Sequence, residues 1–301
     1  DKSNEKLTKG SRDYTDALIE NTLTYDGTIG KHHVNVVVGQ TYEEEYTDEL
    51  TGWAVNFPEP YFLQLQNGAS TYSSSYEYKH AIASYIGRIN YNYDEKYLLS
   101  AVVRRDGSSR LSKNIRWGTF PSVSVGWRVD KEKFFPFTPD VMNMFKIRGS
   151  YGVLGNENIG EFMFQTTMNR NNMTYSFGNT PVTGSAVSTF TDNNLAWEKK
   201  KTTNVGIDVA MFRNRLEFTF EWYKNVSEDL LYAVPVPAQA GVSNTTVTMN
   251  AASMENSGFE FSATYRNNDH DFKYQIGANL STLKNKVTSL GFGTVSYITV
   301  A

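Results

Sequence analysis

The stretch YIGRINYNYDEKYLLSAVV, residues 85–103, decides the fold class of this chain. Most of its apolar and aromatic side chains occupy every second position up to Tyr93 and resume in the same phase at Tyr97, with arginine, asparagine and serine between them. A period of two is typical of a β-strand that has one apolar and one polar face. Residues 94–96, which separate the two runs, indicate a tight turn. The stretch therefore predicts an antiparallel β-hairpin.

The same alternation recurs on both sides of this hairpin, whereas helical periodicity is hard to find. We expect strands in the ranges 17–25, 33–42, 81–94, 97–103, 117–129, 145–153, 204–211, 216–222, 258–265 and 272–280. These are about ten segments, most of them about ten residues long, which is the length that crosses a bilayer's hydrocarbon layer when a strand tilts by about 45°. The predicted fold class is all-β.

Two further features favour an antiparallel transmembrane β-barrel over a soluble β-sandwich or β-helix, which would also alternate. Tyrosine, tryptophan and phenylalanine gather at the ends of the expected strands, as in the aromatic girdles of outer-membrane barrels. The connections also alternate between short and long. Short ones are expected at 26–31, 94–96, 212–215 and 267–271, with 130–143 a longer link on that side, and long polar ones at 43–80, 154–201 and 225–256.

Composition excludes several other classes of protein. The net charge of -3 gives no reason to expect nucleic acid as a partner. The absence of cysteine removes disulfides, thiolate metal sites and thiol catalysis. No apolar run approaches the roughly 20 residues of a membrane helix, a run that barrels also lack because only alternate positions of their strands are apolar.

Several stretches resemble the SusC/RagA family of TonB-linked outer-membrane transporters, which is characteristic of Bacteroidota. The most specific block is RDGSSR (105–110) followed by WGTFPS (117–122) and GWR (126–128). The other matching stretches, in the order of the family, are LTYDG (23–27) with GKH (30–32), RINYNY (88–93) with KYLL (96–99), KIRGSYG (146–152), LAWE (195–198), NVGID (204–208) and NSGFE (256–260).

The resemblance implies a longer parent protein whose barrel has about 22 strands and a plugged lumen. Residues 1–301 would then be part of the TonB-dependent receptor β-barrel domain, and the plug, the TonB box and the N-terminal domain of the family are not visible in this sequence. The implied function is active import, energised by TonB, across the outer membrane of a Gram-negative bacterium. The implied partners are a SusD-like surface lipoprotein, TonB, outer-membrane lipid and an oligosaccharide or peptide substrate. A soluble β-rich glycan-binding or adhesin domain and a passive porin remain as alternatives.

The charges on the polar phase of the expected strands are the first candidate functional residues. Basic residues dominate the first half and acidic residues the second, which would set a basic wall beside an acidic wall inside a barrel. They are Arg88, Arg104, Arg128, Lys146 and Arg148, and Asp208, Glu217, Glu221 and Glu260. We expect these charges to face the lumen and to dock the plug through ion pairs; the simpler interpretation is that they keep the lumen wet.

Aromatic residues in the expected external loops are the second group of candidates. Trp53, Tyr61, Tyr72 and Tyr76 could stack on sugar rings or contact a partner lid. Packing within the loop itself is the simpler explanation.

Catalysis and metal binding find little support, so we expect no enzyme and no cofactor. Glu217 and Glu221 stand four residues apart on one strand face, about 13 Å by strand rise, which is too far for glycoside hydrolysis. His32 and His33 point to opposite faces and cannot chelate one ion together. The acidic run at 43–49 could hold Ca²⁺ in an external loop, but it lacks the spacing of a calcium loop, and a solvated loop is the simpler interpretation.

Overall fold

The computed structural model describes residues 6–58, 64–169, 174–178, 180–187, 189–236, 239, 241–242, 246–267 and 271–290. Its large sheet consists of β1 (Lys6–Ile29), β2 (His32–Val55), β3 (Ser70–Tyr93), β4 (Tyr97–Ser108), β5 (Trp117–Arg128), β6 (Met142–Asn156), β11 (Glu198–Met211), β12 (Leu216–Pro235), β13 (Thr246–Asn267), β14 (Tyr274–Ser281) and β15 (Lys284–Ser289). The short helices η1 (Leu65–Asn67) and η2 (Val129–Lys131) lie in connections.

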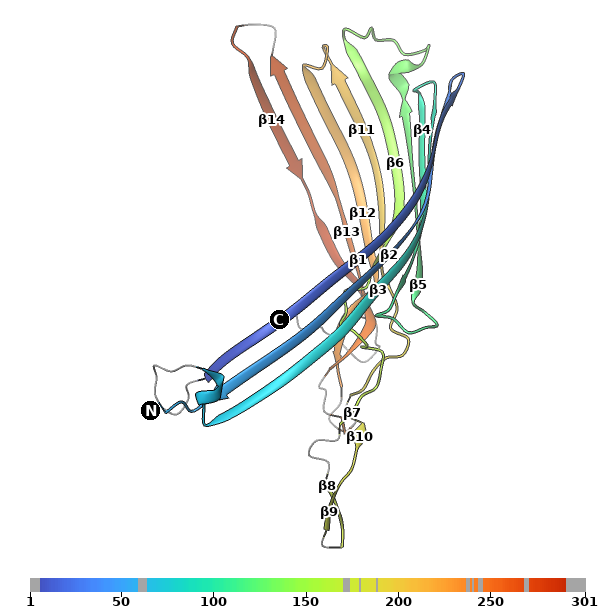
Figure 1. The fold of residues 1–301 in the computed structure, drawn as a ribbon. Helices are drawn as coiled ribbons and strands as arrows, with labels where there is room; N and C mark the ends of the chain where they lie inside the picture. The colour runs from blue at the N-terminus through green and yellow to red at the C-terminus, as the bar shows by residue number, and fades with distance from the viewer. Residues whose placement is uncertain are drawn as a thin grey trace. The chain divides into compact units, whose positions relative to one another are not determined.

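From β1 to β14, each strand of the large sheet pairs with the next one along the chain. Their order is β1-β2-β3-β4-β5-β6-β11-β12-β13-β14, and β15 pairs with β13 beyond the end of β14 (Figure 1). The connection between β6 and β11 carries two small sheets: β7 (Met168–Asn169) with β10 (Ala186–Val187), and β8 (Thr174–Phe177) with β9 (Thr180–Thr183). No helix in the described part of the chain is long and apolar enough to span a membrane.

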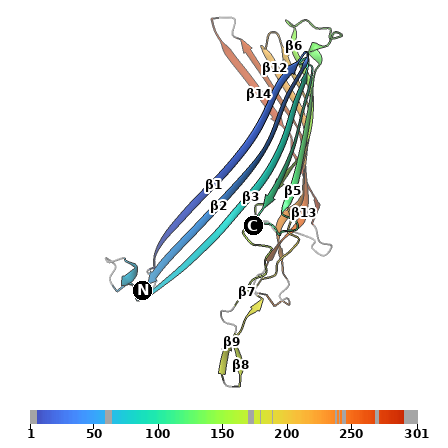
Figure 2. The ribbon, with the colours of Figure 1, turned by 45° about the vertical axis from the view of Figure 1, so that its right-hand side comes forward.

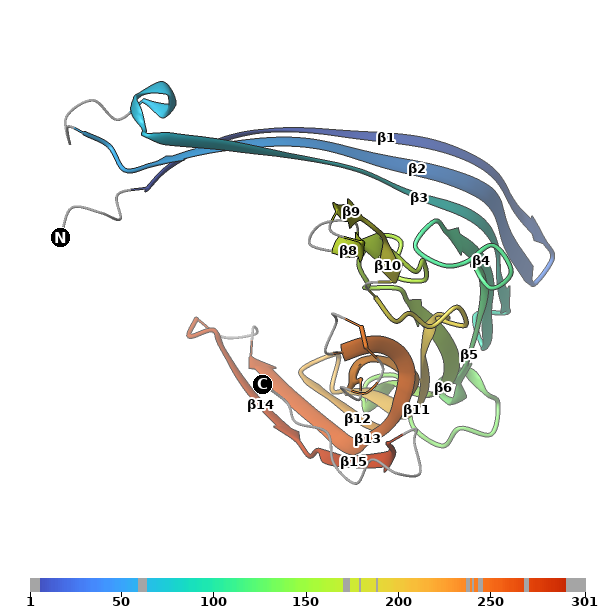
Figure 3. The same ribbon diagram turned by 90° about the horizontal axis from the view of Figure 1, so that it is seen from below.

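The chain divides into two compact units that share the first three strands. Residues 1–20 and 41–83 form the first unit, and residues 21–40 and 84–301 form the second. In the second unit the sheet runs from β4 through β5, β6, β11 and β12 to β13 along a curved line when it is seen end-on (Figure 3).

The register of the second unit separates an apolar face from a polar face. Tyr97, Trp127 and Ile147 lie opposite one another on neighbouring strands, and the row continues through Ile207, Phe220, Phe261 and Leu280. Residues that face each other across a ladder point to the same side of the sheet. Large side chains of this face are exposed (Val125 is 55% and Leu280 66% exposed), as expected of the lipid-facing side of a barrel.

The predicted tight turns are confirmed where the structure describes them. Asp94 and Glu95 both have positive φ, at 52° and 53°, which matches the type of two-residue turn that suits the twist of a β-hairpin. Gly30 between β1 and β2 has a φ of 61°. The Phe212–Arg215 turn uses three positive φ values in succession. The fourth predicted turn, 267–271, lies largely outside the described residues.

Two of the three predicted long loops are wrong. The predicted strand length of about ten residues is close for β4, β5 and β14 but too short for β1, β2, β3, β12 and β13. Residues 43–55 and 70–80 belong to β2 and β3, which have 24 residues each, and most of 225–256 belongs to β12 and β13, with 20 and 22 residues. The error has a physical cause. Runs of polar residues interrupt the apolar alternation in these extensions, at 43–45 in β2, 73–75 in β3 and 227–229 in β12. The period of two is therefore weak in the sequence, although these residues are strand in the structure.

The third long connection, between β6 and β11, is confirmed as a loop. Figure 2 shows its small strands β7, β8 and β9 at the end of the second unit opposite to the connection between β5 and β6.

Candidate functional site

The nine charged residues predicted to share a face do lie on one face of the sheet. Arg148 of β6 lies opposite Gly206 of β11, Gly206 opposite Glu221 of β12, and Glu221 opposite Glu260 of β13. This row is adjacent to the apolar row that contains Trp127 and therefore points to the other side. Register and alternation place the remaining members on the same side: Arg88, Arg104, Arg128, Lys146, Asp208 and Glu217.

Arg148 is the centre of this polar face. Its guanidinium lies 2.5 Å from Glu221 and 3.2 Å from Asp208, so it reaches across β11 to β12. Gly206 makes this reach sterically accessible, because a Cβ at that position would lie 2.9 Å from Cζ of Arg148. The three side chains are largely covered, and the ion pairs tie β6, β11 and β12 together where the basic strands meet the acidic ones.

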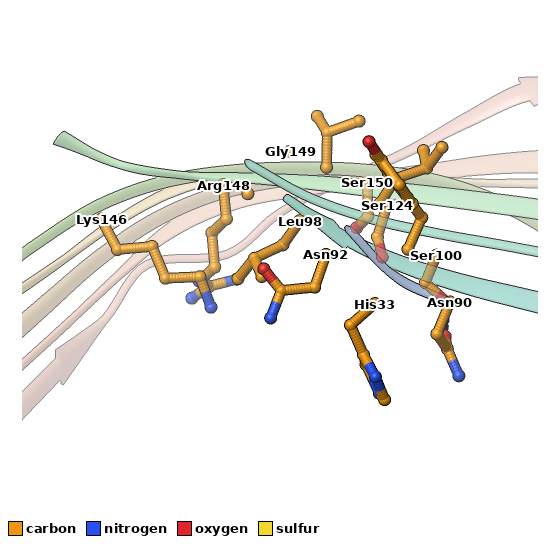
Figure 4. Close-up of a pocket in the computed structure, with 14 residues that line it drawn as sticks. His33, Asn90, Asn92, Leu98, Ser100, Ser124, Lys146, Arg148, Gly149 and Ser150 are labelled. Atoms are coloured by element: carbon orange, nitrogen blue, oxygen red, sulfur yellow. Dashed lines mark hydrogen bonds between the residues drawn. The ribbon is translucent and has the colours of Figure 1, made fainter. Parts of the chain in front are cut away.

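Cavities lie on both sides of Arg148. One, of about 380 Å³, is lined by Lys146, Arg148 and polar side chains of β2 to β6 that include His33, Asn92 and Ser124 (Figure 4). The other, of about 410 Å³, is lined by Arg148, Glu221 and Glu260. Within the described residues, neither Lys146 nor Glu260 has an ion-pair partner. Lys146 and Glu260 therefore leave a cation and an anion without an ion pair in the described part of the chain, on either side of Arg148, whose two carboxylate partners give the centre a net negative charge.

Arg104, Arg128 and Glu217 are held more locally, whereas Arg88 has no ion pair among the described residues. Arg104 binds Asp106 at 2.7 Å and donates to Ser84, and Arg128 binds Asp130 at 2.7 Å. Glu217 pairs with Arg266 on β13 at 2.8 Å. Sequence reasoning found these charges but missed their partners, because partners depend on strand register.

A hydrophobic cluster at the long-loop end was missed by sequence reasoning. Leu111, Phe120, Ile159, Leu195 and Trp197 are buried together. Trp197 donates its indole hydrogen to the carbonyl of Arg116, and Phe120 packs edge-on against Trp197.

Through these contacts the stretches WGTFPS and LAWE meet. Arg110 also binds Glu161 at 2.6 Å. The cluster therefore fastens both ends of the long connection to the sheet.

The first unit brings together two of the four predicted aromatic candidates. Trp53 and Tyr72 stack with ring centroids 5.5 Å apart and an interplanar angle of 16°. They line a cavity of about 550 Å³ together with Lys9, Gly10 and Leu65. Tyr76 is 60% exposed and lies against Tyr78 instead. Tyr61 lies outside the described residues.

Metal-binding geometry is absent from the described part of the chain, where no three histidine or acidic side chains converge. In the acidic run considered for Ca²⁺, Glu44 instead pairs with Lys79 at 2.7 Å and accepts a hydrogen bond from Tyr42. His32 contacts Tyr91 and Tyr93, whereas His33 bonds to Thr28, so the two histidines point apart as predicted.

An antiparallel sheet with one exposed apolar face, one charged face, short turns at one end and a long connection at the other defines the wall of an outer-membrane β-barrel. Residues 2–299 match the family model described as TonB dependent receptor-like, beta-barrel, and the chain belongs to that family. The predicted location in the outer membrane of a Gram-negative bacterium is thereby confirmed.

Individual relatives agree with this assignment. The chain is 36% identical to TonB-dependent receptor P3 of Formosa agariphila over 94% of its own length, and 32% identical to TonB-dependent receptor SusC of Bacteroides thetaiotaomicron over 90%. A structure of the RagAB peptide transporter superposes with a TM-score of 0.82 at 27% identity, covering 95% of this chain and 32% of that one.

The predicted resemblance to the SusC/RagA family is confirmed by these matches. The chain spans 28% and 27% of the two curated relatives. Among the described strands β1 and β14 do not pair, so the described sheet is an open segment of barrel wall.

Proposed function

We propose that this chain is part of the barrel of an active importer, energised by TonB, that takes oligosaccharides or peptides across the outer membrane together with a SusD-like surface lipoprotein. The relatives and the matched structure support import of nutrients. The observation that carries the active mechanism is the charged row on the polar face, with the free ends Lys146 and Glu260 on either side of Arg148. Such an importer performs no covalent chemistry on its substrate.

The polar face lines the lumen in this proposal, since the lipid-facing side of a barrel is apolar. A plug domain inside the lumen would then meet Lys146 with an acidic group and Glu260 with a basic or hydrogen-bonding group. Ion pairs in such a partly covered, wet environment are weak individually. The plug is therefore held by several contacts that can break and re-form when TonB pulls.

Uptake by the whole transporter in cells tests the proposal. Lys146→Gln combined with Glu260→Gln is expected to lower uptake several-fold and to let small antibiotics leak through the outer membrane. Arg104→Gln combined with Arg128→Gln is expected to act in the same direction but less strongly, because Asp106 and Asp130 already hold these cations. Unchanged uptake in both double variants would contradict plug docking. Uptake that persists after TonB depletion would identify a passive porin instead.

Trp53, Tyr72 and Tyr76 are proposed to contact substrate or the lipoprotein lid. The stacked Trp53–Tyr72 pair beside its cavity presents the flat apolar surface on which sugar rings stack. Trp53→Ala and Tyr72→Ala should each raise the concentration of oligosaccharide needed for half-maximal uptake while peptide uptake is unchanged. Equal losses of oligosaccharide and peptide uptake would assign the pair to the contact with the lid. If neither uptake changed, the pair would only pack within its own unit, which would contradict the proposed contact.

The plug, the TonB box and an N-terminal domain are proposed to belong to the parent protein. Mass spectrometry of the intact protein extracted from outer membranes checks this. A mass several-fold above 34.0 kDa is expected, and a mature protein of that mass without a plug would contradict active transport.

A further inference from the structure

The connection between β5 and β6, residues 129–141, folds back onto the apolar face of the sheet. Phe134 lies edge-on against Trp127, with ring centroids 6.3 Å apart. Phe135 stacks on Phe145 of β6 at 6.1 Å and 17°. Trp127 and Phe145 both belong to the apolar face, because Trp127 lies opposite Ile147 in the ladder and Phe145 precedes Ile147 by two residues. The connection therefore continues the lipid-facing surface beyond the strand ends.

A carboxylate holds this connection in place. Glu132 accepts hydrogen bonds from the hydroxyl of Tyr97 at 2.7 Å and from the indole of Trp127 at 3.2 Å, and it lies 3.4 Å from Nζ of Lys96. Tyr97 and Trp127 face each other across the β4–β5 ladder. The polar tips of two aromatic residues are thus satisfied by the protein, so their rings are free to lie in an apolar environment.

Three apolar side chains of the connection are uncovered, beside the exposed polar residues Lys133, Thr138 and Asp140. Phe134 is 68% exposed, Phe137 49% and Val141 38%. Exposed phenylalanines on a short connection are unfavourable in water. They are favourable at the boundary between headgroups and acyl chains, where amphipathic segments of membrane proteins lie.

We propose that residues 129–141 are an interfacial anchor that lays Phe134 and Phe137 into the phospholipid leaflet at the short-turn end of the barrel. The occupant is lipid rather than a second protein because the surface is continuous with the lipid-facing wall through Trp127 and Phe145. Short turns of outer-membrane barrels lie on the periplasmic side, which assigns the anchor to the inner leaflet.

Depth-dependent fluorescence quenching tests this proposal. The segment contains no cysteine, so single cysteines can be introduced into the whole transporter, labelled with bimane and reconstituted in liposomes whose acyl chains carry a doxyl group near the headgroup. The variants are F134C and F137C. V125C on the apolar face of β5 is the lipid control, and K113C in the exposed connection between β4 and β5 is the water control. The unsubstituted protein gives the background from cysteines elsewhere.

Labels at positions 134 and 137 are expected to lose fluorescence to the shallow lipid quencher about as strongly as the label at position 125, and to resist aqueous iodide. Quenching by iodide like that at position 113 would overturn the anchor, because the connection would then lie in water. Resistance to both quenchers would also overturn it, since a protein surface would cover the site. If F134C fails to fold, as judged by heat-modifiable gel mobility, F137C carries the test.

Discussion

The absent side chain of Gly206 decides whether Arg148 can bridge β11. A Cβ there would displace the guanidinium from its path to Glu221, and the displaced atoms belong to the flexible end of a side chain, so the fold should survive. We expect Gly206→Ala to lower the free energy of unfolding by about 1 kcal/mol, since the ion pair is partly exposed to solvent. Urea titration of the transporter in detergent measures this. The control is Gly149→Ala on β6, whose Cβ would meet only ordinary contacts; an equal loss in the control would contradict the explanation.

At Gly155 an added side chain would meet a neighbour that is less able to move. A Cβ there would lie 2.1 Å from the ring of Phe120, and that ring is fixed by Trp197 in the buried cluster. Gly155→Ala should therefore destabilise the protein by about 1–3 kcal/mol, the range for overpacked cores, and expose the long connection to protease. Limited proteolysis alongside urea titration checks both effects. Unchanged protease resistance would show that Phe120 can move aside.

At the scale of the element, the connection that carries Glu132 should respond to pH. Hydrogen bonds from Tyr97 and Trp127 hold the pKa of Glu132 below its ordinary value. Its stabilising contribution is therefore complete above the ordinary carboxyl pKa and is lost as the pH falls through the lowered pKa of the folded state. We expect amide protection over residues 129–141 in hydrogen exchange, corrected for intrinsic rates, to fall with acidification over that window. In the Glu132→Gln variant, amide protection of the connection should not depend on pH in this range. If the variant retained the pH dependence, another titratable group would be its cause.

Strands could be predicted from the sequence where one of their two faces is apolar. The hairpin at 85–103 was predicted with its turn because tyrosine and aliphatic side chains marked its lipid-facing phase. Polar residues interrupt this phase in the extensions of β2 beyond residue 42 and of β3 before residue 81, so the sequence predicts a loop where the structure has strands.

Among the candidate site residues, the shared face of Arg148 and Glu221 followed from alternation alone. Their pairing did not, since contact depends on the register between β6, β11 and β12.

At the scale of the whole molecule, the two edges of the sheet control whether the chain associates with other copies. The described path of ten strands ends at β1 on one side and at β14 on the other, and unpaired backbone groups in an apolar medium each cost several kcal/mol. We expect the 301-residue chain, refolded alone in detergent, to associate through these edges. Light scattering should then show a polydisperse sample with a mean protein mass above 34.0 kDa. The whole transporter should remain monodisperse, because further strands satisfy both edges. Ten antiparallel strands are an even number, so a small barrel in which β1 pairs with β14 is the competing structure. A monodisperse monomer with protected β1 amides would establish that closure and contradict the need for further strands.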